Sequence, residues 1–217
     1  MKMLVVFQKK GAMRFIGHLD LQRAMQRALR RSGLPADYSR GFSPHLLLSF
    51  AAPLSVGIKG EREIMEVPLQ EETGEETFLS RINAVLPGDL KALRARALPD
   101  DHPAAMAGLF AAQYLIQPEQ DADVLLASVP DFLKHETIPY LRRTKSGERM
   151  DDLRLMIYNL VSKEEGLLAT LALQERGTAK PDALMEALAG YAGVPVPHCL
   201  ITRTMLLDER FSPLEDA

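Results

Sequence analysis

This sequence of 217 residues has one cysteine and no tryptophan, and each of these shortages argues against certain classes of protein. Cys199 is the only cysteine, so the chain has no internal disulfide and too few thiolates for an iron–sulfur cluster or a thiolate-bound zinc ion. There is no tryptophan and aromatic residues make up 6%, which argues against a surface built from many base-stacking side chains. Because its neighbours are apolar and proline-rich, we interpret Cys199 as a packed thiol.

Long apolar runs are also missing. No stretch approaches the roughly 18 consecutive apolar residues of a membrane-spanning helix, and Lys9 and Lys10 interrupt the apolar start before it reaches the length of a signal-peptide core. We therefore expect a cytoplasmic protein. No group of histidine, cysteine and acidic residues has the spacing of a metal site, so we predict no metal.

Positive charge is concentrated in the first part of the sequence. The first 50 residues hold nine Lys and Arg against two Asp, a net charge of +7, whereas the whole chain carries −3. The remaining residues therefore carry −10. A separation of charge this large indicates that the first segment meets an anionic partner.

The pattern of apolar residues predicts alternating strands and helices. In the first half we expect strands at 3–7, 46–50, 63–69 and 90–98, and helices at 18–32 and 77–86. After a polar, proline-bounded linker at 99–103, we expect strands at 109–116, 153–161, 167–173 and 200–207, and helices at 122–134 and 181–188. Residues 135–152 fit no element. The order β-α-β-β-α-β thus occurs twice, which predicts an α+β fold of two tandem ferredoxin-like units, at 1–98 and 104–217.

The helix expected at 18–32 has an arginine face beside its apolar face. Four arginines at spacings of four, three and one project from one side over about two turns: Arg23, Arg27, Arg30 and Arg31. This face can bind phosphate oxygens, which match guanidinium in a bidentate geometry, or it can be an ordinary solvated surface. An anion-binding surface, whose affinity falls steeply with salt, is favoured by further cations nearby: Lys9, Lys10, Arg14 and Arg40.

Two histidines flank this region. His18 stands where the helix begins and can cap it or meet a phosphate, and His45 follows the turn at 38–44. The pair can serve as general acid and base in RNA cleavage, or both can be hydrogen-bonded structural residues. In the turn, Gly41 permits a positive φ, and three side chains can hold a nucleotide or fold onto the core instead: Tyr38, Arg40 and Phe42.

A second cationic loop lies at 142–149, with the sequence RRTKSGER and a net charge of +3. It can close over the same ligand as the arginine face, or it can be a solvated loop.

The stretch from Arg14 to Phe50 resembles the radical-SAM-linked domain family, a family of uncharacterised function. The resemblance is strongest in the motifs RFIGHLD and YSRGFSPH, and it continues weakly at Pro53-Leu54, Val56-Gly57, Glu63, Asp152-Leu153-Arg154 and Lys180-Pro181-Asp182. Domains of this family occur beside, or fused to the C-terminal end of, a cobalamin-type radical SAM protein. The sequence departs from the family's pattern at Gly17 and Gly60, where serine is usual, and at Leu46, where proline is usual. Two missing hydroxyls weaken a catalytic role more than a binding role.

The resemblance implies a radical SAM enzyme as partner. That partner would carry the iron–sulfur cluster and S-adenosylmethionine, so no cofactor is expected in this chain. Family members often lie near ribosome or ribonuclease genes, which implies RNA as the ligand. Our leading hypothesis is a non-catalytic accessory module that binds an RNA, such as a tRNA or rRNA, for modification by the partner. The alternatives are a metal-independent endoribonuclease using His18 and His45, and an adaptor whose basic surface meets an acidic face of the partner.

Overall fold

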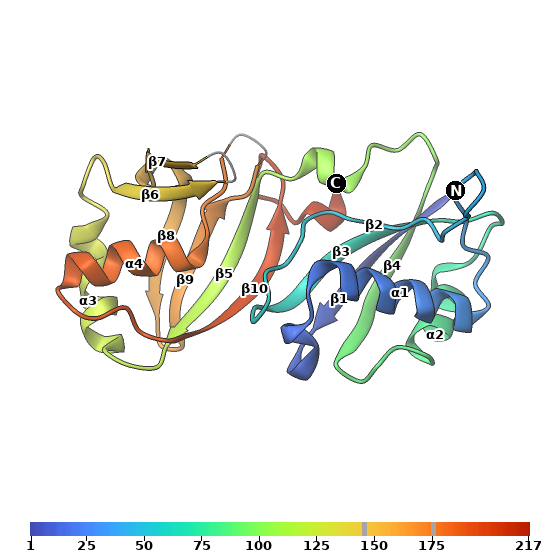
Figure 1. The fold of residues 1–217 in the computed structure, drawn as a ribbon, viewed down its shortest axis with the longest axis horizontal. Coiled ribbons are helices and arrows are strands. Elements are labelled where there is room, and N and C mark those ends of the chain that lie inside the picture. The colour runs from blue at the N-terminus through green and yellow to red at the C-terminus, as the bar shows by residue number, and fades with distance from the viewer. Residues whose placement is uncertain (145–146, 175–176) are drawn as a thin grey trace. The chain divides into compact units, whose positions relative to one another are not determined.

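The computed structural model describes residues 1–144, 147–174 and 177–217, and the chain divides into two compact units (Figure 1). The first unit consists of residues 1–109 and 205–217, and the second unit of residues 110–204. This division differs from the boundary expected between 98 and 104. Residues 99–103, expected to be a linker, belong to the first unit, and so do residues 205–217 from the other end of the sequence.

The first unit is built on an antiparallel sheet with the strand order β4-β1-β3, to which a short β2 adds by pairing with β3. Its strands are β1 (Lys2–Lys9), β2 (Ser49–Phe50), β3 (Lys59–Pro68) and β4 (Leu90–Leu98). Residues Met3 to Phe7 are all buried, because both faces of β1 are covered. This explains why the strand is a continuous apolar run rather than an alternating one.

Two helices cover one face of this sheet. They are α1 (His18–Ser32) and α2 (Glu75–Asn83), and their buried residues pack on Met3, Val5 and Phe7. The predicted bounds of α1 are confirmed: Gly33 ends it with a φ of 66°, the left-handed conformation that glycine tolerates. A five-residue 3₁₀ turn, η1 (Gly11–Phe15), connects β1 to α1.

The opposite face of the sheet is covered by two short 3₁₀ turns, η2 (Ala105–Gly108) and η4 (Leu214–Asp216). The ammonium of Lys2 lies 2.8 Å from the carboxylate of Glu66, and the same carboxylate accepts a hydrogen bond from the backbone N–H of Ala105 at 3.0 Å. Arg62 of β3 pairs with the buried Glu215 of η4. Charged side chains of the sheet therefore hold both turns in place.

The second unit has the strand order β10-β5-β9-β8, with β9 antiparallel to both β5 and β8. Its helices α3 (Ala122–Phe132) and α4 (Pro181–Ala192) pack against each other. The strands are β5 (Ala111–Pro118), β8 (Ile157–Lys163), β9 (Gly166–Ala172) and β10 (Cys199–Leu207). The last three residues of β10 belong to the first unit. β8 starts later than expected, because residues 154–156 form a 3₁₀ turn, η3.

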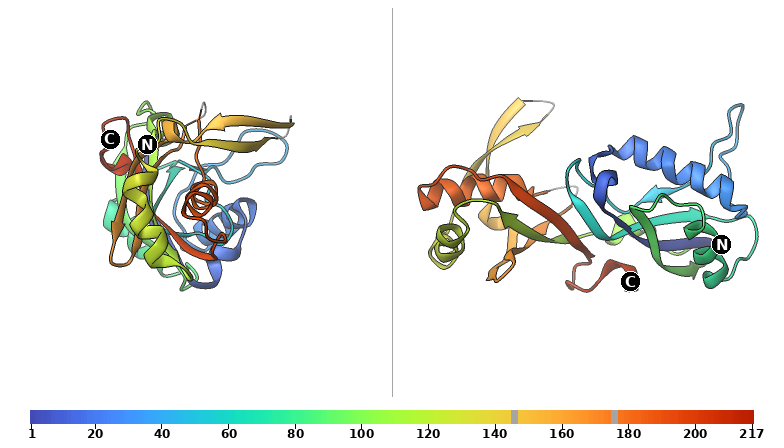
Figure 2. Two further views of the ribbon diagram at one scale, coloured as in Figure 1. Left: turned by 90° about the vertical axis from the view of Figure 1, so that its left-hand side faces the viewer. Right: turned by 90° about the horizontal axis from the view of Figure 1, so that it is seen from below.

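Residues 135–152, for which the sequence indicated no element, contain a two-stranded antiparallel hairpin. It consists of β6 (Pro139–Thr144) and β7 (Gly147–Asp152), and it forms a sheet of its own. Figure 2 shows the hairpin standing away from the main strands of the second unit, with α4 beside its base.

The fold is therefore α+β, with four α-helices among the described residues and mostly antiparallel strands. Over the parts of the chain that the structure describes, no helix has the length and apolar character needed to cross a membrane.

Candidate nucleic-acid interface

The exposed side of α1 carries a line of arginines. One side of α1 is buried against the sheet, through Leu21, Met25, Ala28 and Leu29. The opposite side faces solvent, and residues three or four positions apart in the sequence share that side. All four arginines of the helix are exposed, and we call Arg23, Arg27 and Arg30, which in the described part of the chain do not bond to α2 or its following loop, the α1 arginine face. The amphipathic spacing that builds the core thus also aligns these cations.

The arginines differ in what they contact. Arg23 lies 3.1 Å from the carboxylate of Asp20, one turn earlier on the helix. Arg31 is also exposed, but its guanidinium donates to the backbone oxygen of Val85 at 2.6 Å. Within the described residues, Arg27 and Arg30 make neither an ion pair nor a side-chain hydrogen bond. These two can therefore take up an anion without first losing a partner.

The turn at 38–44 is the tip of a hairpin closed by a bridge between Tyr38 and Leu46. Inside it, Ser39 and His45 hold each other: the Ser39 N–H donates to the His45 oxygen at 2.9 Å, and the Ser39 hydroxyl lies 2.8 Å from His45 Nδ1. The His45 N–H also donates to the Ser39 hydroxyl at 3.0 Å. We call residues 38–46 the loop hairpin. His45 has a structural partner here that the sequence did not reveal, because Ser39 and His45 meet only when the turn closes.

The tip of the loop hairpin presents its side chains to solvent. Phe42 is fully exposed, Tyr38 is 40% exposed, and Arg40 is exposed without an ion pair among the described residues. Gly41 has a φ of 129°, which residues with a side chain rarely adopt. The glycine therefore permits the backbone turn between Arg40 and Phe42, and Phe42 does not fold onto the core.

One hydrogen bond ties the loop hairpin to α1. The Gln26 side-chain amide donates to the backbone oxygen of Leu46 at 2.9 Å, and Leu46 itself is 1% exposed. Figure 1 and the right-hand view of Figure 2 show the hairpin projecting near the C-terminal half of α1. The structure thus brings Tyr38, Arg40 and Phe42 to the half of the helix that carries Arg27 and Arg30.

His18 and Arg14 lie toward the other end of α1. The ring of His18 is exposed and contacts the ring of Phe50 edge-on, with 5.3 Å between centroids. The guanidinium carbon of Arg14 sits 4.6 Å from the centroid of Phe15, and the Nε of Arg14 is buried and has no hydrogen-bond partner among the residues described. Eight helical residues separate His18 from Gln26, about 12 Å along the axis. Among the described residues, no contact joins His18 to His45.

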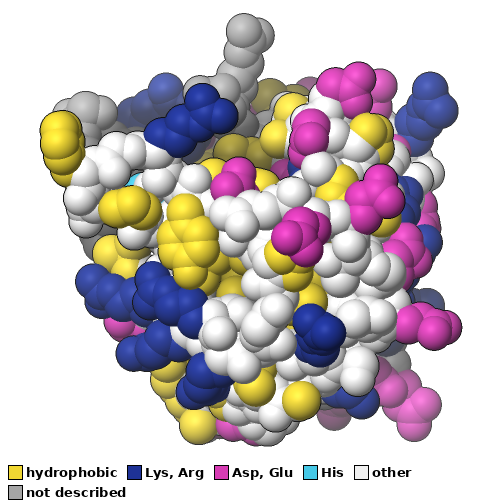
Figure 3. All heavy atoms as spheres, turned by 90° about the vertical axis from the view of Figure 1, so that its right-hand side faces the viewer, with side chains coloured by type: hydrophobic (Ala, Val, Ile, Leu, Met, Phe, Trp, Pro, Cys, Tyr) yellow, Lys and Arg dark blue, Asp and Glu magenta, His cyan; other side chains and the backbone are white. Residues whose placement is uncertain are grey.

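Charge on one face of the first unit is divided between two sides. Figure 3 shows Lys and Arg side chains gathered on one side of this face and Asp and Glu side chains on the other. The acidic cluster that precedes and begins α2 is exposed: Glu71, Glu72, Glu75 and Glu76. An approaching polyanion is therefore attracted to one side and repelled from the other.

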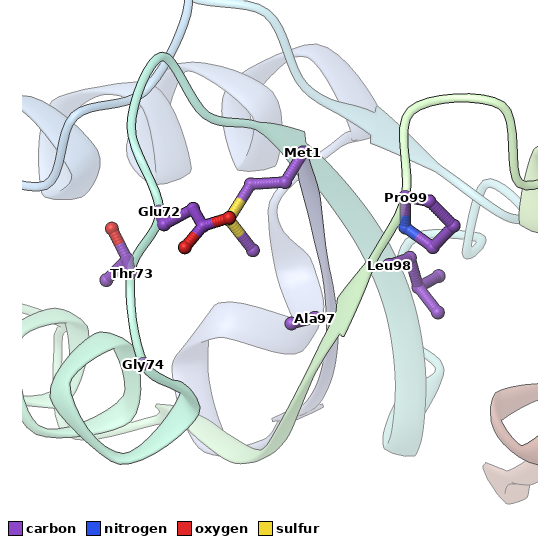
Figure 4. Close-up of a pocket in the computed structure, with 7 residues that line it drawn as sticks. All are labelled: Met1, Glu72, Thr73, Gly74, Ala97, Leu98 and Pro99. Carbon is purple, nitrogen blue, oxygen red and sulfur yellow. The ribbon is translucent and has the colours of Figure 1, made fainter.

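A pocket of about 670 Å³ in the first unit is not part of this surface. Figure 4 shows residues 72–74 on one side of it and residues 97–99 on the other, with the side chain of Met1 extending toward Glu72. None of the predicted site residues is among the residues that line it. The described residues that line it include no Lys or Arg side chain that could bind an anion.

The second cationic loop is partly neutralised. Arg142 lies 3.3 Å and Arg149 2.8 Å from the same carboxylate oxygen of Asp151. These bonds, from Arg149 first and then Arg142, lower the pKa of Asp151. Residues 145–146 of this loop lie outside the described residues. Over the described part of the chain, no group of three or more His, Cys, Asp and Glu is placed to hold a metal ion.

Comparison with known proteins gives one family match. The family described as "Uncharacterized protein conserved in bacteria (DUF2344)" matches residues 2–181. No curated protein matches the chain.

Proposed function

The chain belongs to this family of uncharacterized bacterial proteins, and because the family's description names no activity, we propose a function from the surface of the first unit. The protein is a non-catalytic module that binds an RNA, such as a tRNA or rRNA, and works with a separate radical SAM enzyme in modifying it. The observation that carries this proposal is the pair Arg27 and Arg30. Both are exposed without an ion pair in the described structure, beside a hairpin that displays Arg40 and Phe42.

The chemistry of this surface suits RNA in two ways. Guanidinium groups bind phosphate oxygens, and each phosphate that they neutralise releases condensed counterions from the nucleic acid. An exposed aromatic ring such as Phe42 can stack on an unpaired base, as single-stranded RNA requires. One exposed aromatic ring beside several arginines suits a loop or bulge of a folded RNA better than a long single strand, which several stacking rings would have to bind.

We also infer that each unit is ferredoxin-like. The support in the first unit is the antiparallel order β4-β1-β3-β2 with both helices on one face, and in the second unit the order β10-β5-β9-β8 with α3 and α4 in the matching places of the chain. RNA-binding folds of this kind often use the open face of the sheet. In the first unit η2 and η4 occupy that face, which leaves α1 and the loop hairpin for the ligand.

The proposed partner rests on the resemblance of residues 14–50 to the radical-SAM-linked domain family. The single cysteine agrees with it, since the several thiolates that hold an iron–sulfur cluster would have to come from another chain. The partner would therefore carry the cluster and S-adenosylmethionine, and this chain the RNA.

The test is RNA binding by a double charge reversal, Arg27→Glu with Arg30→Glu, followed by fluorescence anisotropy of a labelled stem-loop RNA. We expect the affinity to fall about tenfold or more, and the slope of log K against log salt to shrink by about 2, because two phosphate contacts are lost. The matched control is Lys91→Glu with Arg210→Glu, which makes the same charge change at exposed residues outside this surface. Equal losses in both variants, or none in either, would show that RNA does not bind here.

The two alternatives make different predictions in the same assay. A metal-independent endoribonuclease would cleave the labelled RNA, with loss of cleavage in His18→Ala or His45→Ala. The structure gives this less support, since His18 contacts Phe50 while His45 is held by Ser39. An adaptor would leave the RNA unbound, and its co-purification with the radical SAM enzyme would survive nuclease but not Arg27→Glu.

A further inference from the structure

The second unit contains a pocket of about 600 Å³ in the angle between the β6–β7 hairpin and α4. Two stretches of the sequence that each carry a cation meet there: β6 at Arg142, and the segment Lys180-Pro181-Asp182 at the start of α4. Figure 2 shows the hairpin rising beside α4. The full lining consists of Tyr140, Leu141, Arg142, Thr178, Lys180, Asp182, Ala183 and Glu186.

Charges of both signs line this pocket without neutralising each other. Lys180, Asp182 and Glu186 are exposed and make no ion pair within the described structure. Arg142 does have a partner, Asp151, on the neighbouring strand of the hairpin. Because a guanidinium has five N–H donors, a single contact at 3.3 Å to Asp151 orients Arg142 and leaves most of its donors available.

The acidic side chains of the lining follow one side of α4, and Lys180 stands at the start of the helix, two residues before Asp182. Asp182 and Glu186 are four residues apart on α4 and therefore lie on one side of the helix. Lys180 precedes the helix as its N-cap residue, and its side chain does not cap the helix. The N–H groups of the first turn add positive potential there, which the carboxylate of Asp182 in the same turn offsets in part. Tyr140 and Leu141 supply ring and apolar surface from the hairpin.

We propose that this pocket binds one nucleoside monophosphate, either free or as a single nucleotide of an RNA. Arg142 and Lys180 bind the phosphate, the Tyr140 ring packs against the base, and the carboxylates of Asp182 and Glu186 accept hydrogen bonds from the ribose or from the amino groups of the base. A pocket of this volume lies within the usual range for small-ligand sites. The α1 arginine face has no part in the site, so free mononucleotides test it separately from the function proposed above.

The experiment is isothermal titration of the full chain with AMP, GMP, CMP and UMP, and with adenosine and inorganic phosphate as partial ligands. We expect at least one monophosphate to bind more than about tenfold more tightly than either part alone, because both the phosphate and the base are recognised. Lys180→Ala should weaken that binding about tenfold, and the matched control Lys163→Ala, at an exposed position in β8, should leave it unchanged.

Two further outcomes decide the proposal. Binding of phosphate and nucleotides with equal affinity, or of none of them at millimolar concentration, would overturn it even if Arg27→Glu with Arg30→Glu abolished RNA binding. Glu186→Gln, a conservative change at an exposed position, should alter the preference among the four bases and leave phosphate binding unchanged. If the preference is unaltered, the carboxylate of Glu186 does not contact the nucleotide. A short oligoribonucleotide that competes with the bound monophosphate identifies RNA as the source, and one that does not compete identifies the free nucleotide.

Discussion

Glu215 is a buried carboxylate held by arginines that are themselves partly in solvent. Its side chain is 2% exposed, whereas that of Arg62 is 43% exposed and that of Arg94 47%. The Arg62 Nε donates to Glu215 at 3.2 Å, and Arg94 lies 3.9 Å from the same carboxylate. The two sides of this pair therefore have unequal access to water.

This inequality predicts unequal mutational effects. Arg62→Ala leaves the Glu215 carboxylate buried with only the distant Arg94, which we expect to reduce the free energy of unfolding by about 3 kcal/mol. Glu215→Gln leaves Arg62 able to reach water and should cost only about 1 kcal/mol. Urea unfolding followed by circular dichroism measures both, with Arg210→Ala as the exposed control. A larger loss for Glu215→Gln would contradict this account of the pair.

The thiol of Cys199 provides the pH-dependent prediction. Burial, followed by the nearby carboxylates of Asp182 and Glu119, raises the pKa of Cys199 from 9.0 to about 11. At pH 8 we expect alkylation by iodoacetamide to be about 100-fold slower in the folded protein than in urea, since only the thiolate reacts. Mass spectrometry of timed samples measures the two rates.

The same shift has a consequence for stability. The folded state favours the neutral thiol, because the pKa of Cys199 is higher in the folded chain than in the unfolded chain. The stability that the folded protein gains from keeping Cys199 protonated is therefore fully present below pH 9 and is lost as the pH rises toward about 11. The alkylation rate of the folded protein should increase between pH 9 and about pH 11, as the thiolate forms. If the alkylation rate at pH 8 is the same in the folded protein as in urea, the Cys199 thiol is not desolvated.

At the scale of elements, the sequence predicts best where local signals and packing agree. α1 was predicted with its observed bounds, because its apolar spacing, the glycine at 33 and the Leu34-Pro35 sequence all indicate the same end. The strand expected at 46–50 shortens to Ser49–Phe50, because the backbone oxygen of Leu46 accepts a hydrogen bond from Gln26 of α1 and Leu46 closes the loop hairpin. The β6–β7 hairpin was missed, because its sequence is charged rather than alternating in polarity.

The candidate interface was predictable only in part. Helical spacing placed Arg27 and Arg30 on one exposed face. It could not reveal that Arg31 is bound to Val85, or that Ser39 holds His45, because these contacts depend on segments brought together by the tertiary fold.

Two glycines at helix ends predict opposite effects of the same substitution. Gly33 follows α1 with a φ of 66°, whereas Gly190 lies within α4, and a Cβ at either would meet no atom within 4 Å. Gly33→Ala should therefore cost about 1 kcal/mol through backbone strain alone. Gly190→Ala should increase the free energy of unfolding by at most about 1 kcal/mol, because alanine has a higher helix propensity than glycine. Thermal unfolding compares them, and shifts of the same sign would contradict this assignment of the two backbones.

At the scale of the whole molecule, the second unit interrupts the first. Residues 110–204 fold as one compact unit, and the segment 205–217 that follows returns to the first unit. There Leu206, Leu207 and Leu214 are nearly completely buried, and Leu214 packs against Gly108. A boundary read along the sequence could not show this, because it requires knowing which distant segments share a core.

The first unit should therefore need residues 205–217 to fold. Burying each leucine contributes about 1.5–3 kcal/mol, so losing three removes much of the roughly 5–15 kcal/mol by which a domain is stable. We expect residues 1–109 alone to lack a cooperative urea transition, and 1–109 joined to 205–217 by a flexible linker to regain one. β10 lies next to β5, and the Thr204 hydroxyl is 3.3 Å from the Gln113 backbone oxygen, so a short linker can span the join.

The matched control replaces 205–217 with a Gly/Ser segment of equal length, which keeps the chain length and removes the leucines and Glu215. It should behave like 1–109 alone, because the stabilising contacts come from those side chains. If 1–109 unfolds at the same urea concentration with and without 205–217, the returning segment lies on the first unit without contributing to its core. If the Gly/Ser segment restores the transition, chain length rather than the buried leucines is what the first unit lacks.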